Sequence, residues 1–199
     1  MSFDALLGHL DFTDEPELPD FVAAPNPQAP LRELGRPTWL YAGPMPLDVR
    51  DRLLAEATAR RGKAARVNTH SMVEGGPIAA EVQTSAELLD FVRTHVPEGV
   101  GFAPTTSYYH WYANGDDRVE PHRDTAEFFL GCILLLEHVA PRECRFYLHP
   151  PGGEPLEVPL EQGHCVVFFS GAVTHSRSRP APGESVNTLT WGFRLTPCE

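Results

Sequence analysis

The chain lacks any long hydrophobic run. None of its 199 residues lie in a stretch approaching the roughly 20 apolar residues that a membrane-spanning helix needs. Its first twenty residues, MSFDALLGHLDFTDEPELPD, are acidic and have no basic start of the kind that opens a signal peptide. We therefore expect a cytoplasmic protein with no membrane partner.

Basic residues are also scarce. The chain has 16 Lys and Arg against 27 Asp and Glu, a formal net charge of −11. A field of this sign repels phosphate backbones, so we expect no nucleic-acid partner. The one local cluster of basic side chains is interpreted as the solvated end of a helix, and it comprises Arg60, Arg61, Lys63 and Arg66.

Cysteine is present four times but never as a CxxC pair. Three of the four cysteines lie inside apolar segments, which is typical of buried, reduced thiols. We expect no metal site built from them, and reduced thiols agree with a cytoplasmic location. The four are Cys132, Cys144, Cys165 and Cys198.

Proline and glycine, in contrast, are abundant, with 20 and 16 residues. Such frequent punctuation favours many short strands over long helices. The proline-rich and acidic residues 1–46 are predicted to form an extended arm over the surface. Residues 47–199 are predicted to form a single domain.

The predicted helices come first in that domain and the strands follow. Residues 47–60 carry apolar side chains at helical spacing, and a second helix is expected to begin with a capping box at Thr84 and Glu87. After Gly101, short aromatic and β-branched segments alternate with turns, a pattern typical of an antiparallel sandwich or barrel. We predict a mainly β fold with two N-terminal helices, a double-stranded β-helix (jelly roll, cupin-like). Its predicted strands are 105–112, 129–136, 144–149, 155–159, 164–170, 173–179 and 185–194.

A candidate metal site lies in the sequence VEPHRDT. His122 and Asp124 are two residues apart, so on a strand their side chains would project to the same side. His175 follows a later predicted strand, about fifty residues on, and supplies a third ligand. Two histidines and one carboxylate leave coordination positions open, as iron(II) needs when it binds both a co-substrate and dioxygen. We predict an iron site at His122, Asp124 and His175.

The segments around this triad carry a resemblance. An aromatic strand ends in Tyr112-Ala113-Asn114-Gly115, the His-x-Asp pair follows, and the apolar run 132–137 comes next. Gly163 to Phe169 then precedes His175, and Leu189-Thr190-Trp191 closes the series. Over about residues 105–194 this order resembles the 2-oxoglutarate and iron(II) dependent dioxygenase superfamily, especially its prolyl-hydroxylase-like branch. The resemblance implies Fe(2+), 2-oxoglutarate as co-substrate, O2, and oxidation of a C–H bond with release of succinate and CO2.

The chain departs from this family at two positions. Its members hold the far carboxylate of 2-oxoglutarate with an arginine near the start of the last strand, where this chain has Ser185. A tyrosine that binds the same carboxylate in some relatives is replaced by Leu135. The predicted strand 173–179 is expected to form a hairpin with 185–194, which would place other side chains opposite Ser185.

Arginines of that strand are the candidate replacements. Arg177 and Arg179 share a face with His175 on a strand, and a guanidinium can bind a carboxylate through two hydrogen bonds. We predict that one of them binds 2-oxoglutarate, with Ser185 and Tyr112 in the same pocket. Surface ion pairing of both is the alternative interpretation. Arg194 is a third candidate, although alternation places it on the opposite face.

Several residues allow two interpretations. Tyr108 and His110 alternate with Tyr112, so they line either the pocket or the barrel core, and Trp191 is likewise a pocket wall or plain packing. The polar loop 113–120 and the glycine-containing segment 62–80 could act as lids. His70 has no partner at ligand spacing, and we interpret it as structural.

The predicted function is that of an oxygenase acting on a small-molecule substrate, with a peptidyl substrate as the second choice. Two alternatives remain open. One is a mononuclear metal enzyme on the same fold that does not use 2-oxoglutarate. The other is a non-catalytic jelly-roll module that binds a ligand or a partner.

Overall fold

Two antiparallel sheets face each other in the computed structural model, which describes residues 40–42, 44–67 and 69–196. This arrangement confirms the predicted jelly roll. The larger sheet has the order β1 (Leu40–Ala42), β9 (Cys165–Phe168), β6 (Leu130–Val139), β11 (Ser185–Thr196), β4 (Gly101–Tyr112), β3 (His70–Glu74), β2 (Ala65–Val67). The smaller sheet has the order β5 (Val119–His122), β10 (Thr174–Arg177), β7 (Phe146–His149), β8 (Leu156–Val158).

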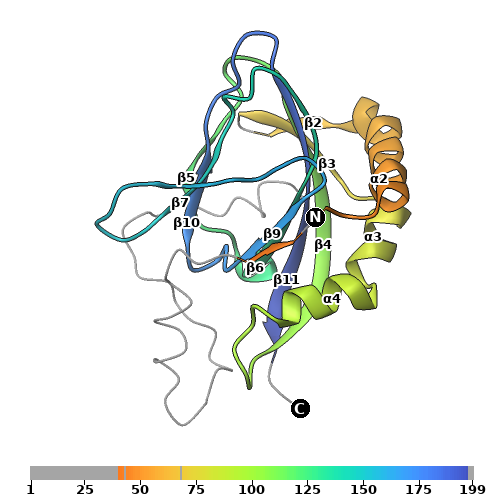
Figure 1. Ribbon diagram of the computed structural model, residues 1–199, viewed down its shortest axis with the longest axis vertical. Coiled ribbons are helices and arrows are strands. Elements are labelled where there is room, and N and C mark those ends of the chain that lie inside the picture. The colour runs from red at the N-terminus through yellow and green to blue at the C-terminus, as the bar shows by residue number, and fades with distance from the viewer. Residues whose placement is uncertain (1–39, 43, 68, 197–199) are drawn as a thin grey trace.

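Three helices cover the outer face of the larger sheet, as Figure 1 shows at the right: α2 (Leu47–Arg60), α3 (Pro77–Gln83) and α4 (Ala86–Arg93). The indole N–H of Trp191 on β11 donates to the carbonyl of Ala79 on α3 at 2.9 Å. The hydroxyl of Tyr109 on β4 donates to Glu56 on α2 at 2.8 Å. Trp191 therefore packs between sheet and helices. None of the described helices is long and apolar enough to cross a membrane.

The first predicted helix is confirmed and the start of the second is corrected. Helix α2 has the predicted bounds. Thr84 does not open a helix but ends α3, which the sequence did not predict. The next residue, Ser85, is the N-cap of α4, and its hydroxyl accepts the backbone N–H of Leu88. Ser85 and not Thr84 caps α4 because Thr84 still belongs to the end of α3, where its backbone N–H donates to the Ala80 carbonyl.

The segment 62–80 is also more regular than predicted. It contains the β2–β3 hairpin and the first turn of α3 instead of forming a lid, and β3 extends the larger sheet beside β4. The loop 113–120 is held by the buried carboxylate of Asp117, which accepts the backbone N–H groups of Ala113 and Asn114. The residues of the predicted arm up to 39 lie outside the described part of the chain.

The predicted hairpin between 173–179 and 185–194 is wrong. Strand β10 pairs with β5 and β7 in the smaller sheet, whereas β11 pairs with β4 and β6 in the larger one. In a jelly roll, consecutive strands pass from one sheet to the other, and the turn between β10 and β11 makes this crossing. Side chains of β10 therefore reach residues of β4 and β11 across the barrel interior, not along a shared sheet.

Strand register defines which side chains enter that interior. Tyr108, His110 and Tyr112 of β4 lie opposite Thr190, Thr188 and Val186 of β11, and directly paired residues share a face. The alternate residues Tyr109 and Trp191 contact the helices. The stripe Tyr108, His110 and Tyr112 therefore faces the space between the two sheets.

Candidate metal centre

His122, Asp124 and His175 meet at one end of the barrel. His122 is the last residue of β5, and His175 lies directly opposite it on β10. Asp124 lies just beyond β5 instead of within it, and its backbone N–H donates to the carbonyl of Ser170 at 2.9 Å. One ligand atom from each of the three residues lies within 4.8 Å of the others. Side chains from two strands and a loop thus converge, although His175 is far in sequence from His122 and Asp124.

The backbone orients both imidazoles. Nδ1 of His122 lies 2.9 Å from the carbonyl oxygen of Glu120, and Nδ1 of His175 lies 3.1 Å from that of Val173. A carbonyl only accepts hydrogen bonds, so each Nδ1 carries a proton and each Nε2 is the nitrogen directed into the site. Backbone carbonyls that orient the imidazole in this way are common around metal-binding histidines.

The distances suit a single ion. Oδ1 of Asp124 lies 3.3 Å from Nε2 of His122 and 3.8 Å from Nε2 of His175. Neighbouring ligands of a six-coordinate ion with bonds of about 2.1 Å lie about 3.0 Å apart. Small side-chain adjustments would therefore close the site around a metal, and two imidazoles with one carboxylate match the facial set used for iron(II).

The electrostatics of Asp124 and His175 suit metal ligands, whereas burial lowers the pKa of His122 but the hydrogen bond and charge of Asp124 outweigh it, so that pKa is raised. Burial opposes the ionisation of Asp124, but the imidazoles of His175 and His122 more than offset it, so the pKa of Asp124 is lowered. Burial lowers the pKa of His175 to about 4, and the neighbouring His122 adds to this. At neutral pH the site therefore presents a carboxylate and a neutral His175, the forms that bind a metal.

A buried arginine continues the site along β10. Arg177 is 6% exposed, and its guanidinium lies 5.1 Å from the ring centre of Tyr112 and 5.6 Å from that of Phe146. It also interacts with the Tyr112 hydroxyl and the Cys144 thiol. None of the ion pairs among the described residues includes Arg177. A buried cation that lacks a carboxylate is costly unless an anion joins it.

The other predicted carboxylate-binding residues lie elsewhere. Arg179 and Arg194 are exposed. Ser185 shares its face of β11 with Asn187, opposite to the face of Val186 that meets Tyr112. Only Arg177 and Tyr112 of the predicted set are brought together in the interior.

The structure was compared with known proteins. It is similar to the non-heme alpha-ketoglutarate-dependent epimerase SnoN from nogalamycin biosynthesis (15% identity over 83% of each chain, TM-score 0.68). It is also similar to a Pseudomonas putida prolyl-4-hydroxylase (20% identity over 84% of this chain and 97% of that chain, TM-score 0.63). The chain has the fold of these 2-oxoglutarate oxygenases. A third similar structure is HygX from Streptomyces hygroscopicus with nickel, 2-oxoglutarate and hygromycin B bound (11% identity, 78% and 82% covered, TM-score 0.63).

Sequence comparison adds no family, because no protein-family model and no curated protein matches the chain. At the identities above, structural likeness establishes the oxygenase fold. The resemblance in the sequence had indicated that fold, and the structure confirms it.

One set of contacts in the interior could not be predicted from the sequence, and it involves His70. His70 on β3 stacks on Tyr112 with ring centres 4.8 Å apart, and its Nε2 lies 3.0 Å from Nδ1 of His110. The contact joins residues forty positions apart through the pairing of β3 with β4, so spacing along the chain carried no signal for it.

Proposed function

We propose that this chain is an iron(II) and 2-oxoglutarate dependent dioxygenase that oxidises a C–H bond of a small-molecule substrate. The observation that carries the proposal is the juxtaposition on β10 of His175 and Arg177. One belongs to a triad that can hold a metal, and the other is a buried cation with no carboxylate partner among the described residues.

The triad would hold Fe(II) through Nε2 of His122 and His175 and a carboxylate oxygen of Asp124. When bound, iron would let O2 act as the oxidant of both the substrate C–H bond and 2-oxoglutarate, each of which gives up two electrons, with release of succinate and CO2. The task of the protein residues is to bind, to orient and to exclude water.

Arg177 would bind the far carboxylate of 2-oxoglutarate. Residues two apart on one face of a strand are separated by about 6.7 Å, which is comparable to the length of a five-carbon dicarboxylate. The ring of Tyr112 lies against the guanidinium and restricts its position. An arginine on β10 would thereby replace the arginine that the family places at the start of the last strand.

The surroundings favour strong binding of this anion. The buried side chains Tyr112, Leu135, Cys144 and Val186 form one apolar cluster beside Arg177. Because a low-polarity environment strengthens charge–charge attraction, a carboxylate paired there with Arg177 is held more firmly than at the surface.

The small-molecule substrate class is supported by two of the similar structures. SnoN has been solved in complex with nogalamycin RO, and HygX with hygromycin B. A peptidyl substrate is the second candidate, supported by the likeness to the prolyl-4-hydroxylase.

The test is an anaerobic titration with iron(II), followed by 2-oxoglutarate, monitored by visible absorption. We expect metal binding and then a weak charge-transfer band, with the band requiring about 30-fold more 2-oxoglutarate in Arg177→Met, since a paired guanidinium contributes about 2 kcal/mol. Arg179→Met, an exposed arginine of the same segment, is the matched control and should titrate like the wild type.

The other outcomes separate the alternatives. Metal binding without the band would leave a metal enzyme that does not use 2-oxoglutarate. Absence of metal binding would leave a non-catalytic jelly-roll module. An unchanged titration in Arg177→Met would show that another group binds the far carboxylate.

A further inference from the structure

Two half-buried histidines from neighbouring strands share one hydrogen bond inside the barrel. Nε2 of His70 on β3 lies 3.0 Å from Nδ1 of His110 on β4. Both rings lie beside Tyr112, with centre distances of 4.8 Å for His70 and 6.4 Å for His110. The pairing of β3 with β4 ends at Ser71 opposite Trp111, and the stacking of His70 on Tyr112 places His70 on the same interior face of the sheet.

The pair lies near enough to the triad and to Arg177 to be affected by their charges. Arg177, Asp124 and His122 act on His110, and Asp117, Arg177, His122 and Arg66 act on His70. Burial lowers the pKa of His70 to about 4 and that of His110 well below its usual value. Both rings are therefore neutral at pH 7, and each carries a single N–H.

Each ring has one nitrogen outside their shared bond. Nδ1 of His70 is buried without a hydrogen-bond partner. Nε2 of His110 makes no hydrogen bond within the described residues. Unlike Nδ1 of His70, it is not one of the fully buried polar atoms without a partner, so it is not enclosed by protein atoms. His110 thus has a nitrogen available to a ligand in the interior, whereas the second nitrogen of His70 is shut in.

Two proton arrangements are compatible with the shared bond. In the first, His70 donates from Nε2, so Nδ1 of His110 accepts and Nε2 of His110 carries the proton. In the second, His110 donates from Nδ1, so its Nε2 is a bare lone pair and a buried N–H is left without an acceptor on His70. Orphaned buried N–H groups are rare in native proteins, which favours the first arrangement.

A carboxylate ligand selects the same arrangement. An ionised carboxylate only accepts hydrogen bonds, so it would be repelled by a lone pair on His110 and bound by an N–H. We propose that His70 is a positioning residue that fixes His110 as an Nε2–H donor to a carboxylate of the co-substrate. This inference rests on the proposed function for the identity of the ligand, but the state of the histidine pair is independent of it.

The first test reads the protons directly. In the metal-free, full-length protein labelled with ¹⁵N, long-range ¹H–¹⁵N correlation spectra at pH 7 distinguish the two tautomers of each histidine. We expect His110 as the Nε2–H form in the wild type and in His70→Gln, whose amide can still donate, and a change of its tautomer population in His70→Phe. A wild-type His110 protonated on Nδ1 would overturn the proposal.

The second test measures binding of 2-oxoglutarate to the iron(II)-loaded protein without oxygen. We expect an affinity about tenfold weaker in His70→Phe, recovered to within about threefold of the wild type in His70→Gln, with iron affinity unchanged in both. Phenylalanine has a ring of similar size to histidine but no hydrogen-bond donor, so His70→Phe separates the loss of the hydrogen bond from a loss of packing. Equal weakening in both variants, or none in His70→Phe, would reduce His70 to a packing residue and sink the proposal.

The matched control is His95→Phe. His95 is also half-buried, and its burial lowers its pKa to about 4, but it follows α4 and stacks on Phe169, with ring centres 5.1 Å apart. We expect it to leave 2-oxoglutarate affinity unchanged. If the wild type binds iron but no 2-oxoglutarate, the proposed function fails, and the tautomer of His110 alone then decides the role of His70.

Discussion

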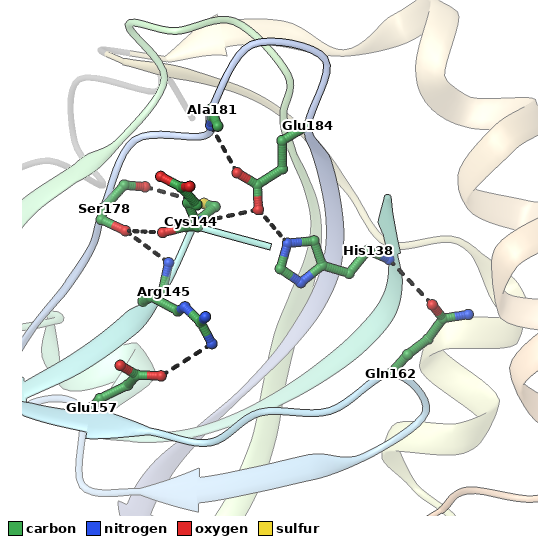
Figure 2. A network of polar contacts seen from close by, with 9 residues as sticks. His138, Cys144, Arg145, Glu157, Gln162, Ser178, Ala181 and Glu184 are labelled. Carbon is green, nitrogen blue, oxygen red and sulfur yellow. Dashed lines mark hydrogen bonds and ion pairs between the residues drawn. The ribbon is translucent and has the colours of Figure 1, made fainter. Parts of the chain in front are cut away.

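Two carboxylates face histidines at opposite ends of β10, and they do different things. Asp124 lies with His122 and His175 at the start of this strand. Glu184 lies past its other end, where one carboxylate oxygen is 2.5 Å from Nε2 of His138 (Figure 2). Both carboxyl groups have a lowered pKa, so neither charge state nor the presence of histidine distinguishes the two sites.

The difference lies in the remaining hydrogen bonds. Glu184 is fully buried and accepts the backbone N–H groups of Cys144 at 2.9 Å and Ala181 at 2.7 Å in addition to His138. Its two oxygens are thus occupied, and it ties three segments together (Figure 2). Asp124 meets imidazole nitrogens whose protons are directed to the backbone on the other side of the ring. A carboxylate whose oxygens are occupied by backbone N–H groups stabilises the fold, whereas Asp124, which accepts no backbone N–H among the described residues, is available to a cation.

The largest expected effect concerns the triad of His122, Asp124 and His175, here called the open site in contrast to the saturated site at Glu184. Asp124→Ala should weaken iron(II) binding by at least about 100-fold, because it removes the only anionic ligand. The stability of the metal-free protein should change by less than about 1 kcal/mol, since no backbone N–H of the described residues donates to this side chain. Isothermal titration and thermal unfolding measure the two quantities.

Glu120→Gln is the control for this variant, because Glu120 is an exposed carboxylate two residues before His122. It should bind iron like the wild type. If Asp124→Ala lost several kcal/mol of stability without metal, Asp124 would be a structural carboxylate like Glu184 and the distinction between the two ends would fail.

The next effect concerns the saturated site. Glu184→Ala leaves two buried backbone N–H groups and the His138 ring without their acceptor, which should cost about 3 kcal/mol of unfolding free energy. We expect a fall in Tm of about 6–12 °C, with the iron affinity of the folded protein unchanged. Glu157→Gln, which breaks only an exposed ion pair with Arg145, should cost less than about 1 kcal/mol. Equal costs in the two variants would contradict the structural role of Glu184.

A smaller loss is expected on the outer face of the larger sheet. Glu56 of α2 accepts the N–H groups of Ile78 and Ala79 at the start of α3, at 2.8 and 3.0 Å, as well as the hydroxyl of Tyr109. Glu56→Gln should destabilise by about 1–2 kcal/mol in chemical denaturation. Glu81→Gln, exposed on α3 and paired only with Arg52, provides the control and should stay within about 0.5 kcal/mol.

The sequence predicted the open site better than the saturated one, for a physical reason. His122 and Asp124 are two residues apart in sequence, and His175 follows a strand of recognisable composition, so composition and order sufficed. Glu184 and His138 meet because β6 and β11 pair with a particular register. No pattern in the residues around either one predicts this contact.

The same reasoning explains the errors. Alternation along β10 correctly placed Arg177 on the face of His175, but it carried no information on which sheet β10 joins, so the hairpin with β11 was wrong. The contact of His70 with His110 could not be predicted either, because β3 and β4 are separated in sequence by α3 and α4. Local patterns determine the direction of a side chain, while contacts between distant strands are set by topology.

The smallest expected effect is on the acid side of the stability curve. Burial opposes ionisation of Glu184, but the N–H of Cys144 and the His138 ring outweigh it, so its folded pKa lies below the ordinary value of 4.5. A lowered folded pKa contributes stability that is complete above the unfolded pKa and disappears as the pH falls through the folded one. The advantage of the wild type over Glu184→Gln should therefore be constant from pH 7 to about 5 and shrink below about 4.5, by at most about 1.4 kcal/mol per pH unit. Urea unfolding at closely spaced pH values measures it, and because Asp124 and Glu56 titrate in both proteins, the difference isolates Glu184. An advantage that grew on acidification would mean that the folded pKa is raised, and the carboxylate would then not be the saturated acceptor described above.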